Sequence, residues 1–387
     1  MAERKRVGLI FSYNENWIAG AYYILNIIHA LNVLEDYEKP TLIILSESKE
    51  NFKKVEFETK YPYLEFFQYP FKKPLFSVLE RSVNKISRFV LNKNLINKSV
   101  DKPFLNFVYP HHIKDLEVNI KKINWIPDFQ EDYLPHLFSK KEVIQRKENQ
   151  KNIFAKGDVV VLSSEDAEAD YLRLYPNTIA KPFVLRFAVN HPDFSKIDIT
   201  DIKQKYNLPE NYFFVPNQFW VHKNHKIILE AVYKLKKKGE SIFVVFSGKE
   251  NDYRNKDYVH SLKSYITKND ITDNVKFLGF LDRKVQLFLM NNSIAVVQPS
   301  LFEGWSTVVE DAKALGKYIV LSDIGVHKEQ ILNGATFFEP KNSEMLANIL
   351  LSIYSDQSKR NKINHNYNQK VLNFGHKFLE LINLESQ

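Results

Sequence analysis

The chain contains no cysteine among its 387 residues. That absence excludes disulfide bonds, thiol catalysis and cysteine-ligated metal sites. No apolar run approaches the roughly 18 residues that a membrane-spanning helix needs. The first apolar run, Val7–Phe11, is too short for the core of a signal peptide and is typical of a buried strand. We therefore expect a cytoplasmic protein.

The net charge of +8 calls for an anionic partner or a solvated basic surface. No nucleic-acid-binding motif or Lys/Arg-dense tract is present, so nucleic acid is not expected as a partner. Basic residues are most one-sided in residues 71–98, where the only acid is Glu80. The lysines and arginines of this stretch are Lys72, Lys73, Arg81, Lys85, Arg88, Lys93 and Lys98.

Residues 79–91 predict an amphipathic helix with one basic and one apolar face. The basic face carries Arg81, Lys85 and Arg88, and the opposite face carries Leu79, Val83, Ile86 and Val90. Two interpretations remain open at this point. The helix is either a solvated surface element or a contact with an anionic membrane surface.

From about residue 211 onward, short apolar segments alternate with helical segments, which predicts βαβ units and a parallel sheet. Strands are predicted at Tyr212–Val215, Ile242–Phe246, Val275–Leu278, Ile294–Val297, Tyr318–Leu321 and Thr336–Phe338. Helices are predicted at Lys226–Lys237, Arg283–Met290, Thr307–Leu315 and Ser343–Tyr354. Six strands of this kind make a complete Rossmann-like domain.

The first half of the chain is less regular but of the same kind. Strands are predicted at Val7–Phe11, Thr41–Leu45, Leu105–Tyr109, Lys122–Ile126 and Val159–Ser163, and a helix at Ala19–Leu31. Leu185–Ser195 is interpreted as the connection between the halves. The predicted fold class is α/β with two doubly wound domains, residues 1–188 and 189–369. A C-terminal helix at about 370–387 is expected to pack back on the first domain.

The most informative motif follows the predicted strand Ile294–Val297. There the chain passes through Gln298-Pro-Ser300 and Glu303-Gly-Trp-Ser306 and enters a helix that carries Glu310. A helix N-terminus after a glycine-bearing loop offers free backbone N–H groups to an anion. Glu303 and Glu310, seven residues apart, flank that site, and carboxylates suit the hydroxyl groups of a sugar or ribose. Alternatively, Glu310 only completes a capping box with Thr307.

A second motif, Pro216–His225, follows the first predicted strand of the second half. Lys223 lies next to the start of a helix, where a cation meets a bound diphosphate. The alternative is a solvated loop lysine. His222 and His225 are expected to cap or pack rather than catalyse.

Together the two motifs resemble retaining GT-B glycosyltransferases, most closely family 4 with its Glu-x7-Glu signature. The resemblance implies two Rossmann-like domains that face each other across a cleft. It also implies transfer of a sugar from a UDP- or GDP-sugar to an acceptor hydroxyl with retention, without a metal or other cofactor. The acceptor is expected to be a saccharide or lipid-linked saccharide of lipopolysaccharide, O-antigen or capsule synthesis. The enzyme would then be peripheral on the inner face of the cytoplasmic membrane.

The resemblance also implies roles for individual donor-site residues. Lys223 would meet the diphosphate, Glu303 the donor sugar and Glu310 the ribose. Asn217 stands where the family usually has an arginine. Further donor contacts are implied for Gly20, Gly248, Phe280, Gly304, Trp305, Ser306 and Thr307.

In the first half, Asp128 follows Pro127, which stands where the family usually has a histidine. Asp128 is expected to touch a sugar hydroxyl or the acceptor, and His112 or His111 to lie near the transferring sugar. Arg186 is a further candidate for the cleft. The departures at Asn217 and Pro127 keep two alternatives open: a noncatalytic sugar-nucleotide-binding partner subunit, and another GT-B enzyme such as a nucleotide-sugar epimerase.

Overall fold

The computed structural model describes residues 3–13, 18–71, 77–96, 101–114, 116, 120–356 and 361–384. The chain divides into two compact units. One comprises Met1–Asn124 together with Ile382–Gln387, and the other comprises Trp125–Leu381. The division into domains predicted from the sequence, at residues 188 and 189, stays a prediction.

The first unit is built on a four-stranded sheet in the order β3-β2-β1-β4, with all neighbouring strands parallel. Its elements are β1 (Arg6–Ile10), α1 (Ile18–Asn32), β2 (Thr41–Ser46), α2 (Lys49–Thr59), β3 (Leu64–Gln68), α3 (Val78–Leu91) and β4 (Phe107–Tyr109). Three of these strands and α1 were predicted. The prediction missed β3, an edge strand whose residues are mostly half-buried, so its hydrophobic signal is weak.

The second unit contains a three-stranded sheet in the order β5-β6-β7. Its elements are β5 (Ile123–Ile126), α4 (Gln130–Tyr133), α5 (Lys140–Lys156), β6 (Val159–Leu162), α6 (Glu165–Leu174) and β7 (Lys181–Val184). The prediction found β5 and β6 but missed β7. That strand lies at the sheet edge and begins Lys-Pro, a composition that edge strands tolerate and central strands do not.

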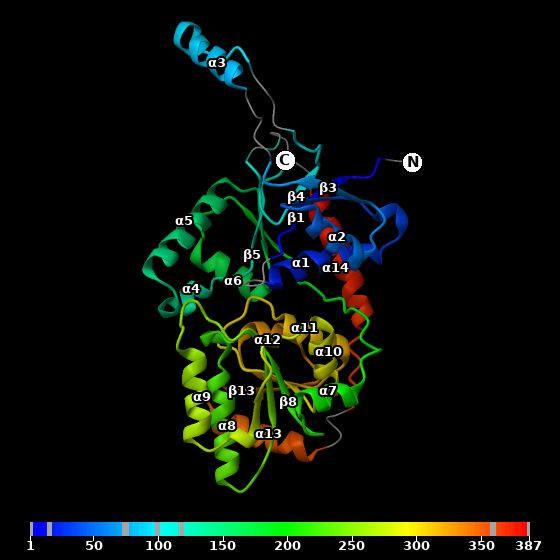
Figure 1. Cartoon of the computed structure of the whole chain (residues 1–387), viewed down its shortest axis with the longest axis vertical. Coiled ribbons are helices and arrows are strands. Elements are labelled where there is room, and N and C mark those ends of the chain that lie inside the picture. Colours follow the sequence, from blue (N-terminus) through cyan, green and yellow to red (C-terminus); the bar gives the residue numbers. More distant parts are fainter. Residues whose placement is uncertain are drawn as a thin grey trace. The chain divides into compact units, whose positions relative to one another are not determined.

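A six-stranded sheet forms the rest of the second unit, in the order β10-β9-β8-β11-β12-β13 with every neighbouring pair parallel (Figure 1). All six predicted strands are confirmed. The strands are β8 (Phe213–Pro216), β9 (Val244–Ser247), β10 (Val275–Phe277), β11 (Val296–Gln298), β12 (Ile319–Ser322) and β13 (Ala335–Phe338). The strand order reverses between β8 and β11, which makes the carboxyl ends of these two strands the expected ligand position.

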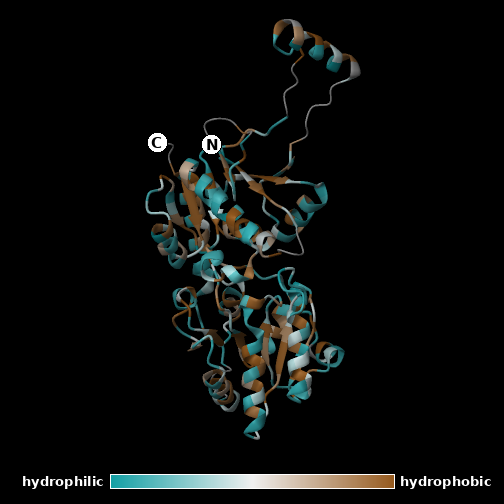
Figure 2. Cartoon of the chain, turned by 90° about the vertical axis from the view of Figure 1, so that its left-hand side faces the viewer, coloured by the Kyte–Doolittle hydropathy of each residue, from teal (hydrophilic) through white to brown (hydrophobic). Residues whose placement is uncertain are grey.

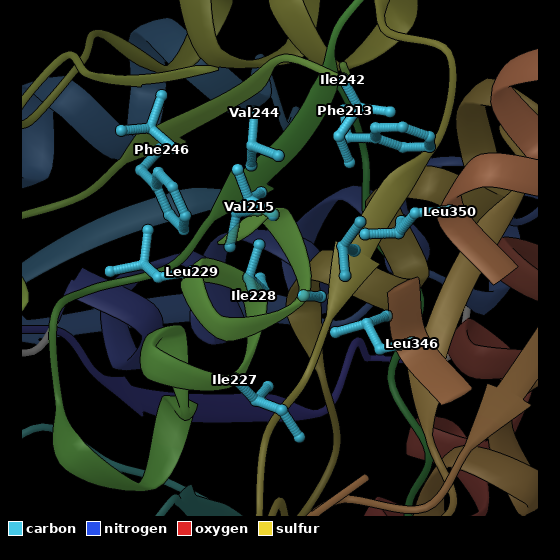
Figure 3. Packing of buried hydrophobic residues seen from close by; sticks show 14 of the residues in the cluster. Phe213, Val215, Ile227, Ile228, Leu229, Ile242, Val244, Phe246, Leu346 and Leu350 are labelled. Carbon is cyan, nitrogen blue, oxygen red and sulfur yellow. The ribbon is translucent and has the colours of Figure 1, made fainter. Parts of the chain in front are cut away.

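Helices cover both faces of this sheet and bury its apolar side chains. The helices are α7 (Ile199–Tyr206), α8 (His225–Lys237), α9 (Tyr258–Lys268), α10 (Arg283–Asn292), α11 (Thr307–Leu315), α12 (Gly325–Gln330) and α13 (Ser343–Ser355), and α14 (Tyr367–Asn383) follows them in the chain. On one face Ile228 of α8 and Leu346 of α13 pack against Val215 and Val244 (Figure 3). On the other face α10 and α11 pack against the alternate residues of the same strands. The strands are accordingly mostly apolar (Figure 2). Polar residues end three of them, namely Ser247, Gln298 and Ser322.

Within the described residues, no helix is long and apolar enough to cross a membrane.

Candidate functional site

The site is positioned by the carboxyl ends of β8 and β11. The loop after β11 runs to Ser306, which caps α11 by accepting a hydrogen bond from Val309 N at 3.4 Å. The loop is tied to the segment after β8, because Leu301 N donates to His222 O at 2.8 Å. Ser306 is therefore the N-cap of α11, and the capping box considered for Thr307 and Glu310 is not the arrangement found.

Lys223 and Glu303 form a nearly buried ion pair, with Nζ and Oε1 2.6 Å apart. Their side chains are 16% and 9% exposed. Burial alone would raise the pKa of Glu303, but the charge and hydrogen bond of Lys223 more than offset this, so the pKa lies below its usual value. The structure thus brings together two residues that the sequence placed 80 positions apart.

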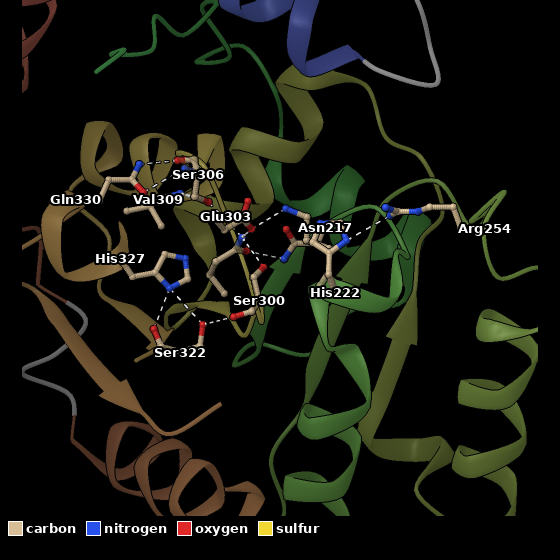
Figure 4. Close-up of polar contacts among 12 residues, drawn as sticks. Asn217, His222, Arg254, Ser300, Glu303, Ser306, Val309, Ser322, His327 and Gln330 are labelled. Carbon is tan, nitrogen blue, oxygen red and sulfur yellow. Dashed lines mark hydrogen bonds and ion pairs between the residues drawn. The ribbon is translucent and has the colours of Figure 1, made fainter. Parts of the chain in front are cut away.

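Gln298 is the centre of a buried hydrogen-bond network around this pair. Figure 4 labels Asn217, Ser300, Glu303 and Ser306, which belong to this network. Gln298 Nε2 donates to Glu303 Oε1 at 2.7 Å, and it lies 3.2 Å from both Ser300 Oγ and Ser306 Oγ. Its Oε1 accepts from Asn217 Nδ2 at 2.6 Å. Sequence reasoning missed Gln298, although a polar residue at the end of an apolar strand was the available signal.

Asp128 lies directly against the loop that carries Glu303. A β-carbon added at Gly304 would come within 2.5 Å of Pro127 O and 3.0 Å of Asp128 Oδ2. Burial, together with the nearby charges of Glu131 and Glu303, raises the pKa of Asp128 to about 6. Asp128 is therefore a carboxyl group that titrates close to neutral pH beside the Lys223–Glu303 pair.

Trp305 and Ser306 are fixed by contacts outside the loop. The Trp305 indole N–H donates to Phe187 O at 3.0 Å. The Gln330 side chain bonds to both backbone groups of Ser306, accepting from its N–H at 3.1 Å and donating to its carbonyl at 2.8 Å. Thr307 is the first residue of α11. These contacts hold the loop in one shape.

Glu310 points toward α12 and α14. Its Oε1 accepts from Lys313 at 2.5 Å and from Gln330 at 3.0 Å, and its Oε2 accepts from Tyr367 at 2.7 Å. Glu310, Trp305 and Lys313 line a cavity of about 650 Å³. Both carboxylate oxygens already have partners in the structure, and the predicted contact with ribose stays a prediction.

The next residue, Asp311, points to the other side of α11. It pairs with Arg283, the first residue of α10, at 2.6 Å, and with His191 Nε2 at 3.0 Å. Burial would raise the pKa of Asp311, but the charge of Arg283 brings it below the usual value. Asp311 lies eight positions after Glu303, so seven residues intervene, against six for Glu310. The Glu-x7-Glu signature has seven intervening residues, so counting from Glu303 leads to Asp311 rather than to Glu310.

Gly248 and Phe280 lie at the ends of the neighbouring strands. Gly248 follows β9, has a φ of +153°, and packs so closely on the Asn217 carbonyl that a β-carbon would lie 2.0 Å from that oxygen. Its N–H donates to Gly279 O at 2.8 Å. Phe280, in the loop after β10, is 55% exposed. Both predicted residues are therefore at the same edge of the sheet as Asn217.

Two further arginines carry charge in this unit. Arg186, a candidate from the sequence, pairs with Glu165 at 2.6 Å and Glu329 at 2.7 Å. Arg254 was not predicted. Its guanidinium lies 3.4 Å from His222 Nδ1 and 5.1 Å from the centre of the Trp220 ring. It therefore places a cation beside the segment that also carries Asn217 and Lys223.

Several predicted residues belong to the first unit. Gly20 is buried in α1. His112 follows β4, and its backbone N–H donates to Asn124 Oδ1 at 3.3 Å. Burial lowers the pKa of the neighbouring His111. The donor and catalytic roles of Gly20 and His112 stay predictions. The predicted loop residues 14–17 lie outside the described part of the chain.

Among the residues that the structure describes, no group of three or more His, Asp or Glu side chains could hold a metal ion.

Residues 198–370 match the sequence model of the family described as glycosyl transferases group 1. The matched segment covers 173 of the 387 residues of the chain. Part of the chain is similar to the O-antigen chain mannosyltransferase RfbU of Salmonella typhimurium, with 27% identity over 173 residues. The aligned part covers 43% of this chain and 45% of that relative, so the chain matches less than half of RfbU.

Solved structures resemble the chain over its full length. A glycosyltransferase from Rickettsia africae superposes with a TM-score of 0.66 at 16% identity, covering 100% of both chains. Anabaena HepE (Alr3699), solved with UDP and glucose, superposes with a TM-score of 0.65 at 18% identity, covering 99% of this chain and 100% of HepE. The predicted GT-B fold class is confirmed.

Proposed function

We propose that the chain is a retaining glycosyltransferase that moves a sugar from a UDP- or GDP-sugar to a hydroxyl group of a saccharide or lipid-linked acceptor. The observation that carries the proposal is the buried Lys223–Glu303 pair at the N-terminal end of α11, 2.6 Å apart and held by Gln298. It occurs where the strand order of the sheet reverses, within the segment that matches glycosyl transferases group 1. Relatives support the donor class, since HepE was solved with UDP and glucose.

The reaction develops negative charge on the phosphate oxygens of the leaving nucleoside diphosphate. Lys223 and the N-terminal N–H groups of α11 supply positive potential for that charge. Glu303 accepts hydrogen bonds from hydroxyl groups of the donor sugar, in partial exchange for its contact with Lys223. The acceptor oxygen attacks the same face that the diphosphate leaves, and the leaving phosphate takes up the acceptor proton. No step of this proposal uses a metal ion.

Asp128 is proposed to contact a hydroxyl group of the transferring sugar or the acceptor. It adjoins Gly304, one residue from Glu303. With its pKa at about 6, its ionised form predominates at neutral pH, and a carboxylate accepts hydroxyl hydrogen bonds strongly.

For the ribose of the donor, geometry favours Asp311 over Glu310. Asp311 pairs with Arg283, which opens α10 directly after the loop of Phe280, the expected neighbour of the base. Base and ribose are adjacent in any nucleotide, whereas Glu310 points toward α12 and α14. We propose that Asp311 holds the ribose hydroxyls and that Glu310 supports the loop through Gln330.

The biological setting that we propose is the synthesis of a bacterial surface polysaccharide, such as lipopolysaccharide, O-antigen or capsule. RfbU, which this chain resembles over part of its length, is an O-antigen chain mannosyltransferase. An acceptor carried by a lipid requires the enzyme to work at a membrane surface. The proposed location is the inner face of the cytoplasmic membrane.

Helix α3 supplies the proposed membrane contact. It begins at Ser77, whose side chain caps it, and residues 93–96 fold back over one side of it. Asn84 Nδ2 donates to Ile96 O at 2.8 Å, and Ser87 Oγ donates to Lys93 O at 2.9 Å. Opposite that covered side, apolar side chains stay in solvent: Leu79 is 79%, Ile86 65% and Phe89 94% exposed.

This combination of exposed apolar and basic side chains suits an anionic lipid surface. Lys85 and Arg88 belong to the same helix, while the predicted Lys72, Lys73 and Lys98 lie outside the described residues. We expect the protein to bind vesicles that contain phosphatidylglycerol, and the Ile86→Ser/Phe89→Ser variant to lose that binding. Phe57→Ser is the matched control, because Phe57 is 80% exposed on α2. Equal binding to neutral vesicles would contradict the electrostatic part of the proposal.

Thermal denaturation with UDP, GDP, ADP and their sugars, with and without magnesium, tests the donor site. A ligand that binds only the folded chain raises the melting temperature. We expect one nucleotide class to stabilise the protein without magnesium, and its sugar to be consumed when acceptor is added. Stabilisation without any turnover would favour the noncatalytic binding subunit, and conversion of the free nucleotide sugar would favour an epimerase. No stabilisation by any nucleotide would contradict the proposed function.

A further inference from the structure

The polar side chain at the end of β8 is Asn217, and it is almost fully enclosed, with 4% of its surface exposed. Its Nδ2 donates to Gln298 Oε1 at 2.6 Å. Its backbone is held as well, because the Asn217 N–H donates to Val215 O at 3.1 Å and Gly248 packs on the Asn217 carbonyl. Asn217 therefore has one defined neighbour for its amide group, and that neighbour is another amide.

That contact decides which way the Gln298 amide faces. A glutamine side chain has one acceptor end and one donor end. Because Asn217 presents an N–H, the acceptor end of Gln298 faces Asn217, and its donor end faces Glu303 at 2.7 Å. If the amide were reversed, the Gln298 oxygen would face the Glu303 carboxylate, and both groups would carry negative charge. Gln298 is fully buried, so water cannot relieve that repulsion.

We propose that Asn217 is a positioning residue that acts on Glu303 through Gln298, rather than a ligand of the donor diphosphate. The chain runs from Asn217 to Gln298 to Glu303, and Lys223 holds the same Glu303 oxygen, Oε1, from the other side at 2.6 Å. The proposal rests on the proposed function in one respect only, namely that Glu303 binds the donor sugar. In this proposal Lys223 and the N-terminus of α11 bind the diphosphate.

Glu303 needs the hydrogen bond from Gln298 in addition to the ion pair, because the Lys223 ammonium group stands at the end of a long, flexible side chain. A charge–charge contact fixes a distance but few angles, whereas the buried amide fixes the plane of the carboxylate. Ser300 and Ser306 complete the surroundings of the Gln298 donor end, each 3.2 Å away. The Glu303 carboxylate, which also accepts a hydrogen bond from the Ser300 side chain, is thereby held in one orientation.

The first experiment compares the affinity of the full chain for the preferred nucleoside diphosphate and for the matching nucleotide sugar. We expect Asn217→Ala and Gln298→Ala to leave the diphosphate affinity within about twofold of wild type and to weaken nucleotide-sugar binding about tenfold. The double variant should lose no more than either single variant, because both interrupt one chain of contacts. A loss of diphosphate affinity in Asn217→Ala, absent in Gln298→Ala, would overturn the proposal.

Asn217→Asp gives a readout that a purely structural role would not produce. An ionised aspartate accepts from Gln298 and turns the amide round, so sugar binding should be weaker than in Asn217→Ala at pH 8. A buried aspartic acid that is protonated at lower pH donates again. We expect the ratio of nucleotide-sugar affinity in Asn217→Asp to that in Asn217→Ala to rise as the pH falls. A ratio that does not change with pH would contradict the relay, by which we mean the action of Asn217 on Glu303 through Gln298.

A ligand-free measurement separates this inference from the proposed function. In urea unfolding, Asn217→Ala and Glu303→Gln should show a coupling energy because Gln298 bonds to both side chains, and Gln298→Ala should abolish it. If wild type bound no nucleotide, the proposed function would fail while this coupling still decided the relay. Additive effects of the two substitutions would overturn the relay whatever the protein binds.

Discussion

Gly304 packs against Asp128 so closely that a β-carbon on Gly304 would lie 2.9 Å from Asp128 Cβ. The contact joins two segments far apart in the sequence: the residues that follow β5 and the loop that follows β11. It explains a glycine at this position by space rather than by backbone conformation. It also places a titrating carboxyl group beside the Lys223–Glu303 pair.

Gly304→Ala should therefore damage the site more than the fold. The methyl group must displace Pro127 and Asp128 or move the loop, and overpacking of this kind costs about 1–3 kcal/mol. We expect a large fall in kcat/KM for sugar transfer, measured by donor consumption, with a lowered melting temperature. Gly239→Ala is the control: its φ of +79° makes it strained, but its β-carbon would meet no atom within 4 Å. Unchanged turnover in Gly304→Ala would contradict the proposed role of this contact.

The raised pKa of Asp128 predicts a pH-dependent contribution to stability. Its folded pKa is about 6 against an ordinary value of 3.8, so the folded state binds the proton more tightly. The resulting stabilisation is complete below about pH 4 and is lost as the pH rises through 6. Asp128→Asn lacks this loss. Between pH 4 and 7 its free energy of unfolding should therefore rise, relative to that of wild type, by up to about 3 kcal/mol.

Urea unfolding at a series of pH values measures that difference. Asp273→Asn, which changes an exposed aspartate, is the matched control. Donor turnover should fall in Asp128→Asn at neutral pH, since an amide accepts hydroxyl hydrogen bonds more weakly than a carboxylate. A constant stability difference would show that Asp128 has an ordinary pKa.

Breaking the Lys223–Glu303 pair should cost both stability and activity. Lys223→Ala leaves the buried Glu303 carboxylate without its counter-charge, which costs about 3–5 kcal/mol when one partner of a buried pair is removed. Glu303→Gln leaves the Lys223 ammonium without its counter-charge, but this long side chain is 16% exposed and can turn toward water, so the variant should destabilise less. Denaturant unfolding and donor-consumption assays on both variants check this. Turnover as fast as wild type in Lys223→Ala and Glu303→Ala would contradict the assigned roles.

The choice between Asp311 and Glu310 is tested with the nucleoside diphosphate, which contains the ribose but lacks the donor sugar. Wild type should bind the preferred nucleoside diphosphate more tightly than its 2′-deoxy form. We expect Asp311→Asn to lose this preference and Glu310→Gln to keep it, with affinities measured by calorimetry. The opposite result would return the ribose contact to Glu310.

Much of the fold was predictable because its signals are local. All six strands of the large sheet are short apolar runs between helices, and burial on both faces demands that composition. The strands β3 and β7 were missed because most of their residues are only half-buried or exposed, which weakens the apolar signal, and β7 also begins Lys-Pro. Glu303 and Lys223 were found from their places at strand ends and helix starts.

By itself, the sequence determined the alternation of strands and helices, and it predicted an anion-binding loop with carboxylates beside it. Only the tertiary structure decided the partners: that Asn217 meets Gln298, that Gly304 meets Asp128, and that Glu310 and Asp311 point to opposite sides of α11. The physical reason is that hydrophobic periodicity depends on neighbours along the chain. The direction of a buried amide or carboxylate depends on which donors and charges distant segments bring to it.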